Sequence, residues 1–226
     1  MTELDSEQRL RLADYFFSRA SGERTTALAF EHIIKDLQYL PGTNDFLQMA
    51  HNAQQDELRH ASICMSYVER YSKAPLPELQ VRGERPVRFP HASEADQRIL
   101  RLVFAGCFSE TFAVQWLLDA HTECTDPQSR AYNRNHLRDE IKHSQLGWRF
   151  VSSGLLTQRD RHMVSAYLPL MLNWSRRLWK DESSEEDPTL SIYGCPPPQS
   201  AAAAVEKALT EVILPGFKLT GFHPIL

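Results

Sequence analysis

Two segments of the chain carry almost the same five residues, Asp-Glu-Leu-Arg-His at 56–60 and Asp-Glu-Ile-Lys-His at 139–143. Apolar residues recur at helical spacing around both copies, so each copy is predicted to lie on a helix. A Glu and a His three residues apart project from one helical face, and each copy therefore directs a carboxylate and an imidazole toward the same point. This repeat constrains the fold, because both copies serve one site only if two helices bring these faces together.

Such a pair of helices supplies half of the ligands of a di-iron or di-manganese site in a four-helix bundle, and each remaining helix adds one Glu. The sequence offers one candidate before each copy, Glu31 and Glu110, and both lie in mostly apolar helical stretches where an unpaired carboxylate would be costly. There are 26 residues from Glu31 to Glu57 and 30 from Glu110 to Glu140. Either interval fits one antiparallel helical hairpin.

Helical periodicity dominates the whole chain, which predicts an all-α fold. Four of the expected helices form the bundle, and the others lie before and after it: about 5–20, 23–40, 43–72, 94–124, 127–154, 159–181 and 199–213. Ser21-Gly22 is expected to separate the first two helices. The prolines of 73–93 predict a long crossover between the second and third bundle helices.

The chain of 226 residues is predicted to be one domain, 1–226, with the bundle core at about 23–154 and a C-terminal helical extension at about 155–226. Pro169 is expected to kink the helix predicted at about 159–181. The acidic segment 181–187 is expected to be a solvated loop. The apolar tail 217–226 is expected to dock on the bundle or to join a subunit interface, which makes a homodimer an open expectation.

Composition excludes several classes of function. The net charge is −4 and basic residues are scattered, so nucleic acid is not an expected partner. No apolar run approaches the roughly 20 residues that span a bilayer, and the acidic, polar N-terminus does not resemble a signal peptide. These features predict no membrane partner and a cytoplasmic location. The four cysteines form no Cys-x-x-Cys pair, which argues against a rubredoxin-like iron site.

Charged residues beside the ligands are expected to support them. Asp56 and Asp139 each precede a Glu of the repeat and point about 100° away around the helix. Each can accept the second imidazole N–H of a His on the neighbouring helix, as carboxylates next to metal-bound histidines do. Arg59 and Lys142 are expected to pair with these aspartates.

At this level of detail the chain resembles the ferritin-like superfamily of di-iron carboxylate proteins, through Glu31, the two repeats and Glu110, over about residues 23–154. The resemblance implies a site that activates O2. True ferritins usually have Gln where this chain has His143, which favours an oxygenase over iron storage. Glu57 and Glu140 are then the expected bridging carboxylates, because each shares a helix with a His.

A histidine at the position of His136 distinguishes some members of this superfamily from others. It lies four residues before Glu140 and seven before His143, on the same helical face. The chain is similar here to the arylamine N-oxygenases, which carry His-xxx-Glu-xx-His on the last bundle helix and use the third His as an iron ligand. The alternative is a histidine beside the ligands or at the surface. Tyr132, one turn earlier, is expected either to line a substrate channel or to pack.

The resemblance implies two Fe ions, with manganese as the alternative, held by seven residues: Glu31, Glu57, His60, Glu110, His136, Glu140 and His143. The four glutamates Glu31, Glu57, Glu110 and Glu140 are the expected catalytic residues. The preferred function is N-oxygenation of an amine. Ligand spacing also resembles the aldehyde-deformylating oxygenases, so deformylation or hydroxylation is the alternative, followed by ferritin-like iron handling or a dimanganese catalase.

O2 and a small organic molecule are the expected substrates. No glycine-rich loop resembles a phosphate cradle, so flavin or nicotinamide is not bound by a recognisable motif, and an external donor such as a ferredoxin or a reductase is expected to supply electrons. Residues one turn from the ligands are expected to line the substrate pocket: Leu28, Ile34, Ala53, Cys64, Gly106, Cys107, Ala113, Val114 and Leu117. Gly106 and Ala113 leave room either for a substrate or for close helix packing.

Overall fold

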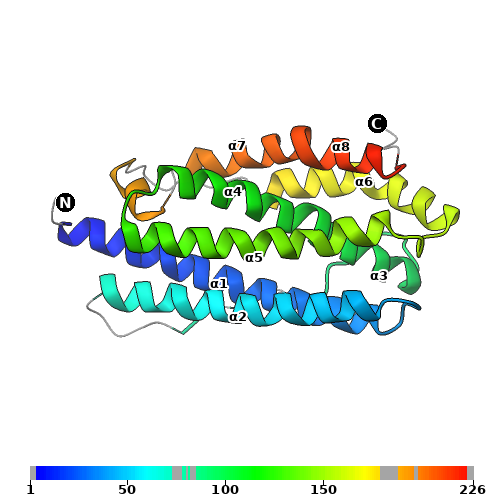
Figure 1. Ribbon diagram of the computed structural model, residues 1–226, viewed down its shortest axis with the longest axis horizontal. Helices are drawn as coiled ribbons and strands as arrows, with labels where there is room; N and C mark the ends of the chain where they lie inside the picture. The colour runs from blue at the N-terminus through cyan, green and yellow to red at the C-terminus, as the bar shows by residue number, and fades with distance from the viewer. Residues whose placement is uncertain are drawn as a thin grey trace.

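The computed structural model describes residues 4–72, 78–79, 81, 85–178, 188–195 and 198–222, and every regular element in them is helical (Figure 1). The all-α prediction is confirmed. The elements are α1 (Ser6–Leu37), α2 (Asn44–Tyr71), α3 (Glu94–Val103), the π-helix η1 (Phe104–Ser109), α4 (Glu110–Glu123), α5 (Pro127–Ser152), α6 (Gln158–Leu178), the 3-10 helix η2 (Pro188–Tyr193), α7 (Pro198–Ala208), the π-helix η3 (Leu209–Ile213) and α8 (Leu214–Leu219).

The α1 helix is continuous, and the expected break at Ser21-Gly22 is wrong. A glycine inside a helix costs about 1 kcal/mol relative to alanine, which tertiary packing can offset. Here α1 packs along α2 on both sides of the glycine: Phe16 stacks on Tyr67 at 4.4 Å between ring centroids, and Ala20 and Ala27 are buried. The leading helix and the first bundle helix are therefore one element.

Helix boundaries follow local signals. Asp5 and Gln8 form a capping box at the start of α1, and Gly42 adopts φ 74° in the turn before α2. Asp126 caps α5, which has a proline in its first turn. Gly42 and Asp126 lie in the two hairpin loops, and the positions of these loops set which residues of each helix pair lie level.

Two antiparallel hairpins form the centre of the molecule, α1 with α2 and the rod α3–η1–α4 with α5 (Figure 1). The α2 helix ends at the side of the molecule opposite to the start of α3. The described part of the predicted crossover, residues 78–79, 81 and 85–93, contains no helix or strand. The remainder of the predicted crossover lies outside the described residues.

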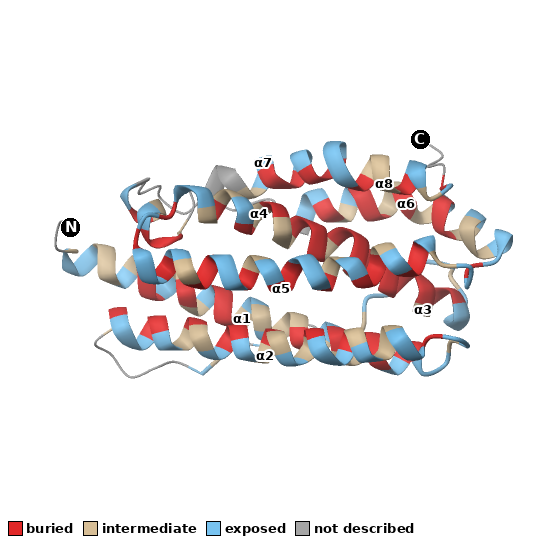
Figure 2. Cartoon of the chain, viewed as in Figure 1, coloured by how far each residue is buried: buried red, intermediate tan, exposed pale blue. Residues whose placement is uncertain are grey.

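The C-terminal elements α6, α7, η3 and α8 form a further layer on the side of α4 and α5 away from α1 and α2 (Figure 1). Buried side chains follow the helix faces that meet between these layers (Figure 2). Phe217 and Phe222 are fully buried, and Phe217 packs on Phe108. This part of the predicted apolar tail docks on its own chain, whereas residues 223–226 and the acidic segment 181–187 lie outside the described residues.

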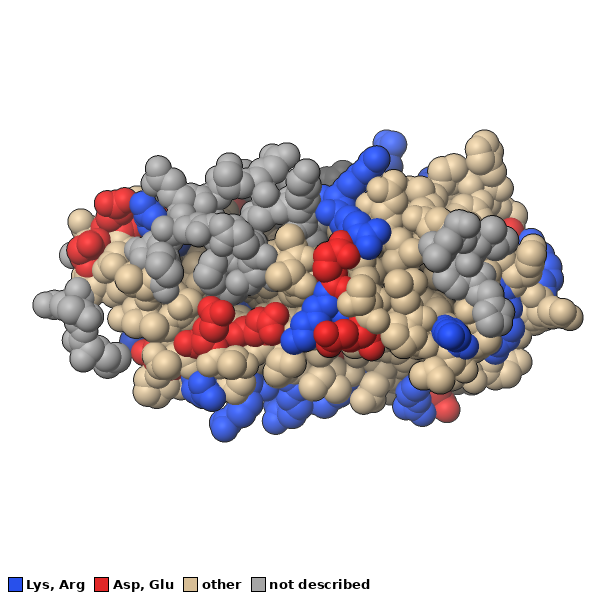
Figure 3. All heavy atoms as spheres, turned by 90° about the horizontal axis from the view of Figure 1, so that it is seen from above, with Lys and Arg blue, Asp and Glu red and all other residues tan. Residues whose placement is uncertain are grey.

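Charged side chains of both signs lie side by side on the face seen from above in Figure 3. Arg176 Nε and Glu206 Oε1 lie 2.6 Å apart, and this ion pair links α6 to α7. Pro169 lies inside α6, and the helix continues past it. Among the described residues, no helix combines the length and the apolar character that crossing a membrane requires.

Candidate metal centre

Carboxylates and imidazoles from four helices meet in the middle of the bundle and form two overlapping groups. The ligand atoms of the first group lie within 4.8 Å of one another and come from Glu23, Glu57, His60, His136 and Glu140. Those of the second group meet the same limit and come from Glu57, Glu110, Glu140 and His143. Glu57 on α2 and Glu140 on α5 belong to both groups. Each group could hold a metal ion, and these two carboxylates are common to both groups.

Six of the seven residues predicted as ligands lie in this cluster, and Glu31 does not. The Glu31 side chain is 44% exposed and pairs with Lys35 at 2.6 Å between Oε1 and Nζ, which lowers the pKa of Glu31. Glu23, on the same helix and 14% exposed, takes the place that the sequence assigned to Glu31. The prediction of Glu31 as a metal and catalytic residue is therefore wrong.

Hairpin register explains the error and would have identified Glu23. In the second hairpin the loop is centred near residue 125, which places Glu110 level with Glu140. In the first hairpin the loop spans 38–43, and the position level with Glu57 is then about residue 24. Glu31 lies about seven residues from that level, or roughly 10 Å along a helix. The expected break at Ser21-Gly22 removed Glu23 from consideration, because it placed this residue at a helix start.

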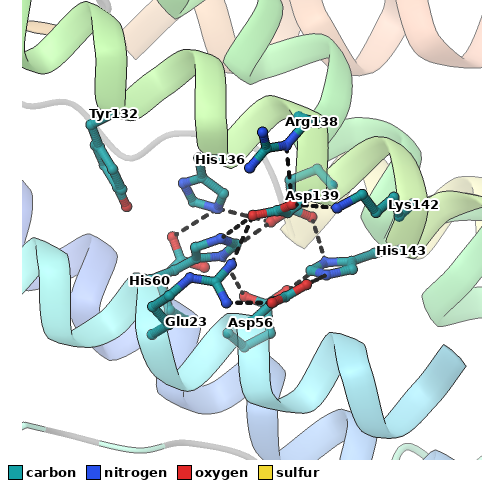
Figure 4. Close-up of polar contacts among 12 residues, drawn as sticks. Glu23, Asp56, His60, Tyr132, His136, Arg138, Asp139, Lys142 and His143 are labelled. Carbon is teal, nitrogen blue, oxygen red and sulfur yellow. Dashed lines mark hydrogen bonds and ion pairs between the residues drawn. The ribbon is translucent and has the colours of Figure 1, made fainter. Parts of the chain in front are cut away.

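The histidines of the two repeats are oriented by aspartates of the opposite repeat, as predicted (Figure 4). His143 directs Nδ1 to Glu57 Oε1 at 3.0 Å and Nε2 to Asp56 Oδ2 at 3.3 Å. His60 directs Nδ1 to Glu57 Oε2 at 3.6 Å and Nε2 to Asp139 Oδ2 at 3.6 Å. Each imidazole thus turns one nitrogen inward to the cluster and the other outward to a carboxylate, the usual arrangement around a metal-bound histidine.

Basic side chains balance these two aspartates, which confirms a second expectation. Arg59 pairs with Asp56 and also reaches Asp139 Oδ2 at 2.8 Å. Lys142 pairs with Asp139 Oδ1 at 2.8 Å. The pKa of Asp139 is lowered although its burial acts in the opposite direction, so the carboxylate stays ionised beside His60.

His136 lies inside the cluster and not at the surface. It is 2% exposed, and Nε2 is 2.8 Å from Glu140 Oε1 and 3.6 Å from Glu23 Oε1. Its other nitrogen, Nδ1, is 2.7 Å from Nη2 of Arg19. Because a guanidinium only donates, Nδ1 accepts this hydrogen bond, and the neutral ring carries its proton on Nε2.

The electrostatics of the cluster are those of a site that lacks positive charge. Burial, and then the charge of Glu140, raise the pKa of both Glu57 and Glu110 well above its usual range. Burial also acts to raise the pKa of Glu140, but the adjacent imidazoles of His136 and His143 hold it well below its usual range. The buried carboxylates therefore cannot all ionise together, whereas two divalent cations would allow it.

Orphaned polar atoms give a second indication that the residues fit a metal. Both carboxylate oxygens of Glu57, both ring nitrogens of His60 and Nδ1 of His143 are buried without a hydrogen-bond partner. An unsatisfied buried polar group costs about 1–3 kcal/mol. Bonds to metal ions from the Glu57 oxygens and from Nδ1 of His60 and of His143, the ring nitrogens that face the cluster, would remove that cost.

Local backbone irregularity positions Glu110. The π-helix η1 ends at Ser109, directly before it, and such segments are frequent at functional sites. The rod also approaches α5 closely at this point: a Cβ on Gly106 would lie 2.6 Å from the backbone nitrogen of Gly147. Gly106 therefore serves close helix packing, which decides between the two alternatives that the sequence left open for it.

A cavity of about 270 Å³ adjoins the carboxylates on the side of α1 and α4. Its walls are partly charged and partly apolar: Arg19, Gly22, Glu23, Thr26, Glu57, Ser109, Glu110, Ala113, Trp116, Leu117, His136 and Glu140. Of the nine residues predicted to line the pocket, Ala113 and Leu117 do so. Cys64 and Cys107 are buried thiols whose pKa is raised by burial.

A second depression, of about 480 Å³, lies on the opposite side of the cluster, between α2 and α5. It is more polar and reaches His60 and His136 from outside: Asp56, Arg59, His60, Ile63, Tyr132, Asn135, His136, Arg138, Asp139 and Lys142. Tyr132 lines this depression and places its hydroxyl 3.1 Å from Sγ of Cys64. The cluster thus lies between a partly apolar cavity and a polar depression.

No protein-family model, curated protein or solved structure matches this chain.

Proposed function

We propose that this protein is a ferritin-like di-iron oxygenase that uses O2 to oxidise a small organic substrate, with an amine as the preferred substrate. The observation that carries the proposal is the pair of overlapping ligand groups that share Glu57 and Glu140 in a buried part of the bundle. Adjacent groups with two common carboxylates suit two ions, because each carboxylate has two oxygens to offer.

The ligand chemistry supports iron, with manganese as the alternative. Carboxylates and imidazoles suit both metals, and none of the four cysteines is among the cluster residues. The chain path agrees with this assignment. Each hairpin contributes a Glu from its first helix and a Glu-x-x-His from its second, as in ferritin-like dinuclear sites.

The cavity beside the carboxylates supports an oxygenase over iron storage. Ala113, Trp116 and Leu117 form an apolar wall next to Glu110, and the volume of about 270 Å³ suits a small molecule. His136 in the cluster supports the N-oxygenases over the aldehyde-deformylating enzymes, which lack this histidine.

Bound iron would supply the reduction of O2, and the residues of the chain would hold and shield it. Glu57 and Glu140 would lie between the two ions, while Glu23 and Glu110 would each bind one ion at the cavity side. Asp56 and Asp139 would keep the proton of each repeat histidine on its outward nitrogen, which leaves the inward nitrogen free to bind. Electrons would come from an external ferredoxin or reductase.

Oxygen consumption by the iron-loaded protein tests this proposal. With a chemical reductant and a panel of small amines, we expect O2 uptake that depends on the amine, with oxygen from O2 found in the product by mass spectrometry. Peroxide disproportionation without any organic substrate would instead indicate a catalase. Elution as a very large cage during size exclusion, with uptake of many irons, would indicate storage.

A further inference from the structure

We propose that Arg19 is an anion-binding residue in the cavity, and that the substrate carries a carboxylate that bridges Arg19 and His136. This inference rests on the proposed function, because it concerns the substrate of the same metal site. Arg19 was not among the residues that the sequence singled out.

The guanidinium of Arg19 is buried and mostly unused. Its side chain is 7% exposed, and it lines the cavity of about 270 Å³ next to the ligand cluster. Nη2 donates to His136 Nδ1, whereas Nε and Nη1 have no hydrogen-bond partner. These two nitrogens carry three of the five N–H donors of a guanidinium, so most of the hydrogen-bonding capacity of this buried side chain is unused.

The charges around the cavity leave one positive charge without compensation. Four glutamates lie at the cavity wall, Glu23, Glu57, Glu110 and Glu140, and their four negative charges balance two divalent ions. Arg19 reaches one of them, Glu23, at 3.6 Å, and that carboxylate belongs to the metal cluster. A single carboxylate on the substrate would balance the buried guanidinium, which is expensive to leave unpaired.

His136 gives an independent reason for a carboxylate at this position. His60 and His143 each have an aspartate beside the nitrogen that points away from the cluster, but Nδ1 of His136 faces Arg19. When a metal occupies Nε2, the neutral ring carries its proton on Nδ1, and two donors then face each other. A carboxylate that accepts from both would relieve this conflict and serve His136 as the aspartates serve the other two histidines.

The aromatic and apolar residues near Arg19 indicate the chemistry of the rest of the substrate. The Arg19 guanidinium carbon lies 5.0 Å from the ring centre of Trp116 and 5.4 Å from that of Tyr132, contacts that hold the cation but do not neutralise it. Trp116 also lines the cavity beside Ala113 and Leu117. A small monocarboxylate with an apolar body fits this combination of one cation and an apolar wall.

Benzoate and its uncharged analogue benzamide form a matched pair of probes. For the iron-loaded protein we expect calorimetry to show benzoate binding at least about tenfold tighter than benzamide. Arg19→Gln should weaken benzoate binding about 10- to 100-fold, as expected for loss of charge-assisted hydrogen bonds, and should leave benzamide binding unchanged. Arg19→Lys should restore part of the preference. Arg134→Gln, on the exposed face of α5, is the control and should bind as the wild type does.

Two results would overturn the inference. Equal affinity of the wild-type protein for benzoate and benzamide would show that the cavity does not select an anion, and this comparison needs no variant to fold. Undiminished benzoate binding by Arg19→Gln would show that the carboxylate binds the metal ions without this residue. Iron content separates the two proposals: a protein that holds no metal contradicts the proposed function, whereas two bound irons without a preference for benzoate contradict only the role of Arg19.

Discussion

The hairpins α1–α2 and α4–α5 supply matching ligands but surround them differently. Each gives a Glu from one helix and an Asp-Glu-x-(Arg/Lys)-His from the other, and each aspartate faces the histidine of the other hairpin. Four residues before the repeated Glu, however, α2 has Ala53 and α5 has His136. The shared part is what a dinuclear site requires. We propose that the differences decide which substrate the site accepts.

This asymmetry makes the two groups unequal. The first has five residues, including two histidines, and adjoins Arg19, while the second has four residues and one histidine. The lone glutamates differ as well. Glu23 comes from the continuous α1 and is 14% exposed, whereas Glu110 follows a π-helix and is 3% exposed. An ion in the first group would therefore lie closer to the proposed anion site than an ion in the second.

The largest effect is expected from the two shared carboxylates. Glu57→Ala or Glu140→Ala removes a ligand from both groups at once, so each variant should lose both metals. Elemental analysis of purified protein should show about two metal ions per chain in the wild type and almost none in either variant. Full metal retention in both variants would contradict the dinuclear site.

The next effect separates Glu23 from Glu31. Glu23→Ala should lower the metal content to about one ion per chain, because Glu23 belongs only to the first group. Glu31→Ala is the matched control on the same helix and should keep two, since Glu31 pairs with Lys35 at the surface. Metal loss in the Glu31 variant alone would restore the assignment made from the sequence.

The repeat histidines should give the metal-free protein a stability that depends on pH. Burial acts to lower the pKa of His143, but the adjacent Glu140 carboxylate raises it to about 9. Its protonated form thus stabilises the fold below about pH 6.5, and that contribution is lost as pH rises through about 9. The free energy of unfolding should fall by up to about 3 kcal/mol between these values.

Burial and the charge of His136 instead lower the pKa of His60 to about 3. His60 is protonated in the unfolded chain below about pH 6.5 but stays neutral in the folded chain, so it reduces the free energy of unfolding only below that pH. Urea unfolding of metal-free protein at pH 6.5 and 9 measures the difference. His143→Gln should flatten the dependence and His60→Gln should leave it unchanged in this range. If the free energy of unfolding of His143→Gln fell more steeply with pH than that of the wild type, the predicted stabilisation by protonated His143 would be contradicted.

The smallest effect is expected from the aspartates that orient the histidines. Asp56→Asn and Asp139→Asn should each lower metal affinity about tenfold, the lower end of the range for such partners. Competition with a chelator measures this change. The two variants should behave alike, because Asp56 and Asp139 occupy equivalent places, and Arg134→Gln on the exposed face of α5 is the control. A strong effect of only one aspartate would show that the hairpins differ here too.

Much of the site could be predicted because it depends on local periodicity. The spacing of Glu57 from His60, and of His136 from Glu140 and His143, places these side chains on one helical face whatever the surrounding fold. The buried Glu110 was recognisable from its apolar neighbours for the same reason. The pairing of Asp56 and Asp139 with histidines of the opposite repeat also followed from their angle around the helix.

Contacts between different helices were harder to predict from the sequence. Glu23 and Glu31 are both glutamates of α1, and only the position of the hairpin loop shows which is level with Glu57. Gly106 reads equally well as an open pocket wall or as a packing position until Gly147 is found against it. Arg19 offered no signal in the sequence, because its significance depends on contact with His136, 117 residues away.

The sequence by itself determined that the chain is helical and that two of its helices each present a carboxylate and an imidazole on one face, because a 3.6-residue period fixes direction around a helix. The tertiary structure alone decided that Glu23 completes the cluster, that Gly106 serves packing and that Arg19 enters the cavity. Position along a helix pair depends on loop placement and on helix continuity, and these are set by the packing of α1 on α2 and of η1 on α5.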